Sequence, residues 1–135
     1  MRYLALLMLA LIFGCSSENF VIINNKTIQV EIADNNEERV TGLMFREELC
    51  ENCGMLFIFD DSEPRSFWMK DTLIPLDMIF IDENYEIVNI KHATPCLEGS
   101  CMTYDSGMKA KYVLELNGRF TDKNNIKIGD KLEIL

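Results

Sequence analysis

Hydrophobic residues follow the patterns of β-strands over most of the chain. Ile28, Val30 and Ile32 alternate with polar residues, as expected for a strand with one buried face. Leu132 and Ile134 repeat this alternation near the end of the chain. Shorter apolar stretches predict further strands at residues 66–69, 87–91 and 111–116. The chain is therefore predicted to be mainly β.

Two continuous apolar runs predict strands that are buried on both faces. Residues 55–59 (MLFIF) and 78–81 (MIFI) are too short for free-standing helices, and glycine or acidic residues bound them. Turn residues separate the predicted strands at 83–84, 117–118 and 129–130. Short strands at close spacing favour a compact antiparallel β-sandwich or a small barrel.

One short α-helix is predicted after residue 33. Asp34 can cap its N-terminus, and Glu37 stands three residues later as the partner of a capping box. Val40, Leu43 and Met44 then follow at helical spacing. This helix is expected to cover one side of the sheet.

The first residues have the pattern of an export signal. A short basic start is followed by the ten apolar residues 4–13, about half the length needed to cross a bilayer. The sequence Ile12-Phe13-Gly14-Cys15 resembles the bacterial lipobox, in which the cysteine thiol is lipidated and the chain is cut before it. A plain secretory signal that contains a cysteine is the alternative.

This signal predicts the organisation and the location of the protein. Residues 1–14 form the lipoprotein signal peptide, residues 15–19 a lipidated tether that begins at Cys15, and residues 20–135 a single β domain without internal repeats. The mature protein is expected in the bacterial cell envelope, anchored to the membrane and facing the periplasm or the outside.

Charge restricts the partners of this domain. The chain has 22 acidic and 13 basic residues and a net charge of −9. Such an acidic surface disfavours nucleic acid and anionic lipid headgroups. Membrane attachment would therefore depend on the lipid.

Several motifs are distributed over most of the chain. They are residues 38–39 (ER), 41–46 (TGLMFR), 54–59 (GMLFIF), 67–82 (FWMKDTLIPLDMIFID), 112–116 (YVLEL) and 128–130 (IGD). Together they resemble the family catalogued as domain of unknown function 192, over roughly residues 27–135. The resemblance implies a compact, mainly β domain of jelly-roll-like type, commonly found behind signal peptides. It implies no agreed activity.

Four cysteines remain besides Cys15: Cys50, Cys53, Cys96 and Cys101. In an oxidising compartment they are expected to form disulfides, and four cysteines allow three pairings. The family resemblance favours a bridge between Cys96 and Cys101, which leaves Cys50 to pair with Cys53. Such short loops would chiefly shape the surface.

The cysteines also suggest an alternative function, as a thiol redox protein or a soft-metal protein. Cys50 and Cys53 have the spacing of a thiol oxidoreductase, but the helix N-terminus that lowers a thiol pKa is not expected there. All four cysteines, with His92, could bind copper or zinc. No metal site and no other cofactor are predicted from this sequence, and soft-metal binding or thiol redox activity is kept as the alternative function.

A third group of residues combines charges with the single tryptophan: Arg39, Arg46, Trp68, Lys70, Thr72 and Asp77. Charges within apolar runs need partners. We therefore expect Asp77 to pair with one of the three cations as a structural bridge. Alternatively, the group lines a cleft beside Trp68 that holds a small polar or carbohydrate-like ligand.

No catalytic set is evident in the sequence. His92 is the only histidine, so any Ser-His-Asp or Cys-His arrangement would have to use it, and no Gly-rich phosphate loop is present. The prediction is a lipid-anchored extracytoplasmic binding or accessory module, more consistent with a non-enzymatic role. Its expected partners are the membrane, through the anchor, and a small polar ligand or an envelope protein.

Overall fold

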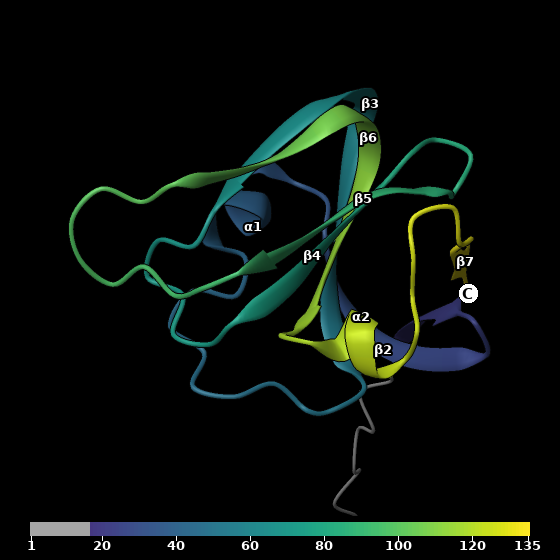
Figure 1. The fold of residues 1–135 in the computed structure, drawn as a ribbon, viewed down its shortest axis with the longest axis horizontal. Helices are drawn as coiled ribbons and strands as arrows, with labels where there is room; N and C mark the ends of the chain where they lie inside the picture. Colours follow the sequence, from purple (N-terminus) through teal and green to yellow (C-terminus); the bar gives the residue numbers. More distant parts are fainter. Residues whose placement is uncertain (1–16) are drawn as a thin grey trace, which may run out of the picture.

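The computed structural model describes residues 17–135, so the predicted signal peptide and Cys15 lie outside it. Seven strands form one sheet in the order β5-β4-β6-β3-β2-β1-β7 (Figure 1). The elements are β1 (Asn19–Ile23), β2 (Lys26–Ala33), α1 (Asn36–Thr41), β3 (Cys53–Trp68), β4 (Leu76–Ile81), β5 (Ile87–Ala93), β6 (Thr103–Asn117), α2 (Phe120–Lys123) and β7 (Glu133–Ile134). The predicted mainly β fold is confirmed.

None of the helices in residues 17–135 has the length and apolar character to cross a membrane.

The sheet curls into a half-barrel, because its two ends approach each other. An antiparallel bridge joins Glu86, just before β5, to Lys131, just before β7. The backbone N–H of Leu132 also donates a hydrogen bond to the carbonyl of Tyr85 at 2.8 Å. Neighbouring strands are antiparallel except β2 and β3. That pair is parallel because the chain between the two strands crosses over through α1.

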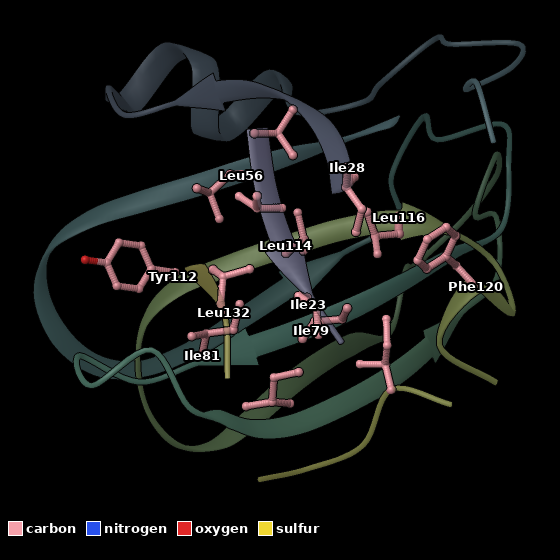
Figure 2. Packing of buried hydrophobic residues seen from close by; sticks show 14 residues of the cluster. Ile23, Ile28, Leu56, Ile79, Ile81, Tyr112, Leu114, Leu116, Phe120 and Leu132 are labelled. Atoms are coloured by element: carbon pink, nitrogen blue, oxygen red, sulfur yellow. The ribbon is translucent and has the colours of Figure 1, made fainter. Parts of the chain in front are cut away.

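The main hydrophobic core fills the inside of the curled sheet (Figure 2). Strand alternation places Leu114 and Leu116 of β6 in this core. β4 is buried at all six positions, as its continuous apolar run predicts. The other buried members come from strands β1 to β6 and the C-terminal segment: Val21, Ile23, Ile28, Val30, Leu56, Ile79, Ile81, Ile87, Tyr112, Phe120, Ile126 and Leu132.

A second hydrophobic core lies against the opposite face of the sheet. Val113, which directly precedes Leu114 along β6, points to the opposite face and belongs to this second core. Its other buried members are Ala33, Leu43, Met55, Phe57, Met69, Leu76, Met78, Phe80, Ala93, Tyr104 and Ala110. The methionines among them fill the core, as expected for a flexible apolar side chain.

The two longest strands, β3 and β6, bend together and arch over α1 (Figure 1). Their pairing shifts register between Ile58 and Glu63 and again between Pro64 and Ser66, and such bulges bend a strand pair. The predicted strand at residues 66–69 is therefore largely the second half of β3. The bend brings both halves of β3 close to α1.

Helix α1 begins one residue later than the sequence predicts. Its N-cap is Asn35, whose side-chain oxygen accepts a hydrogen bond from the N–H of Glu38 at 2.9 Å. The helix ends at Gly42, which has a positive φ of 46°. The apolar residues consequently do not share one buried helical face: Val40 is exposed, and Leu43 is buried beyond the helix end.

Candidate functional site

A pocket of about 430 Å³ lies between α1 and the bent strand β3. This volume is within the range of small-molecule sites. The helix and the turn after it contribute Asn36, Arg39, Val40, Thr41, Gly42, Leu43 and Met44. The remaining lining residues are Phe57, Phe59, Ser66, Phe67 and Trp68 of β3, Lys70 and Thr72 after it, and Glu115 of β6.

Aromatic rings from both halves of β3 form one wall of this pocket. Phe57 and Phe67 pack edge to face, with ring centroids 5.0 Å apart. Trp68 also lines the pocket and is 48% exposed. The Nζ atom of Lys70 lies 5.3 Å from the Trp68 ring centroid, and the guanidinium of Arg39 lies 5.1 Å from that of Phe59. The wall therefore already attracts cations.

Glu115 is the one carboxylate among the lining residues of this pocket. It belongs to β6 and pairs in register with Met55 of β3 and Met78 of β4. Alternation along β6 directs its side chain to the face opposite Leu114 and Leu116. Glu115 is only 4% exposed, and burial raises the pKa of its carboxyl to about 8.

The Glu115 carboxyl has no side-chain hydrogen bond and no ion pair to a protein group within residues 17–135. No fully enclosed side-chain oxygen in this part of the chain lacks a hydrogen-bond partner. The Glu115 oxygens must therefore border accessible space, and the pocket is the space that Glu115 lines. A buried, unpartnered carboxyl thus faces the pocket.

The pocket brings together four residues of the predicted polar cluster: Arg39, Trp68, Lys70 and Thr72. Arg39 is held in place by a hydrogen bond from Nη1 to the carbonyl of Ile58 at 2.8 Å. The buried Thr72 hydroxyl donates to the carbonyl of Lys70 at 3.2 Å. A pocket therefore lies beside Trp68, lined by these four residues but not by Arg46 or Asp77.

Arg46 lies outside this pocket and pairs with Glu31 of β2. Its two terminal nitrogens contact the two carboxylate oxygens at 2.6 and 2.9 Å. The hydrogen bonds of this pair lower the pKa of Glu31 and raise the pKa of Arg46. Both side chains are substantially exposed, so the pair belongs to the surface.

The expectation that Asp77 pairs with Arg39, Arg46 or Lys70 is wrong. Asp77 is fully buried and accepts hydrogen bonds from the Arg119 N–H at 3.0 Å and from the N–H and hydroxyl of Thr121 at 2.9 and 2.7 Å. Its remaining contact is the Nδ1 atom of His92 at 2.7 Å. Asp77 does not line the Trp68 pocket either.

The hydrogen-bond donors from Arg119 and Thr121 belong to the N-cap and first turn of α2, a helix that the sequence did not predict. Antiparallel pairing of β4 with β5 places His92 directly opposite Asp77. The start of α2 then supplies the free N–H groups that a helix N-terminus leaves without intrahelical partners. Asp77 therefore attaches α2 to the sheet.

The structure joins Cys50 to Cys53 and Cys96 to Cys101 by disulfides, the pairing that the family resemblance favours. Oxidised cysteines cannot act as thiolate ligands or nucleophiles. In residues 17–135, histidine, cysteine, aspartate and glutamate form no group of three or more arranged to hold a metal ion.

Sequence reasoning did not single out Glu115 or the phenylalanines of the pocket wall. The available signal was an acidic residue inside the apolar run of residues 112–116. A charge in such a run indicates a buried group with a special role. Only the bend in β3, however, reveals that Phe57 and Phe67 face the same space.

Comparisons with known proteins place the chain in a family without an assigned activity. A UPF0127 protein of Thermococcus sibiricus (strain DSM 12597 / MM 739) is 34% identical over 110 residues, which span 79% of this chain and 66% of that protein, just under two thirds of its length. A crystal structure from Sinorhizobium meliloti 1021, described as a proposed transcription regulator, has a TM-score of 0.78 and 35% identity, and the match covers 87% of this chain and 92% of that one.

A second solved structure, of a protein of unknown function from Novosphingobium aromaticivorans DSM 12444, has a TM-score of 0.77 and 33% identity, with coverage of 86% of this chain and 83% of that one. The family DUF192, described as "Uncharacterized ACR", matches residues 20–134. This match includes nearly all of the part of the chain that the structure describes. The chain therefore belongs to the DUF192 family.

Proposed function

We propose that this protein is a lipid-anchored binding module of the bacterial cell envelope and that it holds a small organic ligand in the pocket between α1 and β3. The lipobox-like sequence that ends at Cys15 supports the anchor. The observation that carries the binding role is the Glu115 carboxyl, which is buried, unpartnered and open to the pocket.

A bound ligand would explain why this carboxyl is tolerated. A buried polar group without a partner is unfavourable by about 1–3 kcal/mol, and more for a charged group. Groups of this kind therefore require a specific explanation. The aromatic wall provides apolar contact area, and Glu115 provides one convergent polar group, as in typical small-molecule sites.

Binding fits the lining of the pocket better than catalysis does. Glycoside hydrolysis requires two carboxyl groups that face each other across the scissile bond, and the lining of this pocket contains Glu115 alone. The ionisable groups of the lining are Glu115, Arg39 and Lys70, and both cations contact aromatic rings. They are thus placed to orient a ligand.

The net charge of −9 does not favour a nucleic-acid partner for this chain. The soft-metal or thiol redox function remains the alternative. It would first require reduction of the Cys50–Cys53 or Cys96–Cys101 disulfide.

The ligand can be sought directly in protein that is purified from its own envelope fraction. Small molecules released by denaturation would be identified and quantified by mass spectrometry. We expect one compound in near-stoichiometric amount from the wild type. Val40→Phe adds bulk to an exposed residue of the pocket lining and should deplete this compound, whereas Met108→Phe, at an exposed position outside that lining, should retain it.

Two results would contradict the binding role. One is equal retention of the compound by Val40→Phe and Met108→Phe, because the compound would then bind elsewhere. The other is a protein that releases no compound and whose Trp68 fluorescence responds to no member of a small-molecule library.

A further inference from the structure

We infer that the ligand of this pocket is an organic cation, with an apolar body and an ammonium group that pairs with Glu115. The inference rests on the proposed binding function and specifies its ligand class. It follows from the presence of a buried, unpartnered carboxyl in the lining of an aromatic-walled pocket.

An ammonium group supplies what the Glu115 carboxylate lacks. It brings a compensating charge and up to three hydrogen-bond donors into a site where the protein supplies neither. A neutral ligand would leave the charged form of Glu115 unpaired, and a carboxylate ligand would be repelled by it. Among the three classes, only the cation makes the charged form of this residue favourable.

The aromatic wall favours the same class of ligand, because the faces of aromatic rings attract cations. Two rings of the lining already do so within the protein: Trp68 attracts Lys70, and Phe59 attracts Arg39. In residues 17–135, no side-chain cation lies over the rings of Phe57 and Phe67. The partly exposed Phe67 ring is therefore available to a ligand, whereas Phe57 is almost fully buried.

The other charges of the site do not neutralise Glu115. From α1, Arg39 faces the pocket, but its guanidinium bonds the Ile58 carbonyl and the Asn36 side chain. From the segment after β3, Lys70 lies over Trp68. The neighbouring strands β3 and β4 place uncharged Met55 and Met78 beside Glu115. Among the cations that line the pocket in residues 17–135, Lys70 is consequently the one that could compete with a ligand ammonium for Glu115.

Binding of an ammonium ligand should release the proton of Glu115, and the resulting pH dependence of the affinity distinguishes this ligand from a neutral one. Burial raises the pKa of Glu115 to about 8, so the empty site holds a proton at neutral pH. An ammonium ligand must displace this proton, and its affinity should rise about ninefold from pH 6 to pH 7 and about fivefold from pH 7 to pH 8. A neutral ligand that accepts a hydrogen bond from the protonated acid would instead bind more weakly as the pH rises.

Three probes with one aromatic ring and different head groups test this inference: phenethylamine, 2-phenylethanol and 3-phenylpropionate. Binding to the full exported protein, held in lipid nanodiscs, would be followed by Trp68 fluorescence at pH 6, 7 and 8. Phenethylamine should bind about tenfold or more tightly than the alcohol at pH 8, with the expected rise in affinity from pH 6. Glu115→Gln should remove both the preference and the pH dependence, while Glu133→Gln, at an exposed position of β7, should retain them.

The outcomes separate this inference from the proposed function. Equal affinity for the amine and the alcohol, or amine binding that Glu115→Gln leaves unchanged, overturns the cationic ligand but preserves the binding pocket. Amine binding that appears only in Lys70→Met also overturns it, because Lys70 would then be the natural partner of Glu115. The absence of a saturable response to all three probes overturns the inference together with the binding function.

Discussion

Replacing Glu115 by glutamine should change how the stability of the domain depends on pH. The folded protein raises the pKa of this carboxyl from 4.5, its ordinary value, to about 8, because burial disfavours the charged form. Between these two pH values the folded state retains a proton that the unfolded state releases. The contribution of Glu115 to stability therefore decreases as the pH rises through this window, and it becomes constant above pH 8.

The structure sets the size of this effect. Each pKa unit corresponds to about 1.4 kcal/mol, so the difference between 4.5 and about 8 corresponds to at most about 5 kcal/mol of lost stability. Glutamine has nearly the same shape and does not titrate. The free energy of unfolding of Glu115→Gln, relative to wild type, should therefore increase by roughly 3–5 kcal/mol between pH 5 and pH 9. A packing penalty from the substitution shifts this difference equally at every pH.

Urea unfolding at intervals from pH 5 to pH 9, followed by circular dichroism with the disulfides intact, would measure the difference. Other titrating groups affect both proteins and cancel in the comparison. Glu133→Gln, which alters an exposed residue, should parallel the wild type. Parallel stability curves for wild type and Glu115→Gln would show that the carboxyl is not desolvated, and the argument from an uncompensated acid would then be refuted.

Four further substitutions test separate parts of the structure. Asp77→Ala should destabilise the domain by about 3–5 kcal/mol in urea unfolding, because it leaves the buried donors of α2 without an acceptor. Arg46→Ala should lower stability by less than about 1 kcal/mol in the same assay, since its ion pair is exposed. Gly54→Ala should lower stability by roughly 1–3 kcal/mol or more, because its Cβ would lie 2.5 Å from the Glu115 carbonyl across the β3–β6 pair. Cys15→Ala should move the protein from the membrane fraction to the soluble fraction and block incorporation of labelled fatty acid; unchanged fractionation would argue against the lipid anchor.

Much of the sheet could be predicted from the sequence, because the burial of strands leaves a local signal. The alternation of Ile28 and Val30 with polar residues and the continuous run at residues 78–81 correspond directly to β2 and β4. Other features have no comparable signal. The capping box of α1 is displaced by one residue because both Asp34 and Asn35 are good N-caps. Helix α2 has four residues and no hydrophobic periodicity that could reveal it.

The candidate site was predictable only in part, because its residues are distant in sequence. The cluster of Arg39, Trp68, Lys70 and Thr72 was identified from charges and the tryptophan within or near apolar segments. Its assignment to one cleft with Asp77 failed, because Asp77 extends toward α2 and His92. Which face of a fully buried strand a side chain occupies cannot be deduced when both faces are apolar.

Asp77 and Glu115 show why burial alone does not identify a functional acid. Both are carboxylates in apolar strands, on β4 and β6, and neither has an arginine or lysine partner within residues 17–135. Asp77 accepts three hydrogen bonds from α2 and its cap and contacts His92, so the fold itself compensates for its burial. Glu115 has no such compensation, and its oxygens border a pocket. A ligand can supply the compensation that Glu115 lacks within the fold, and on this difference rest the structural role of Asp77 and the binding role that we propose for Glu115.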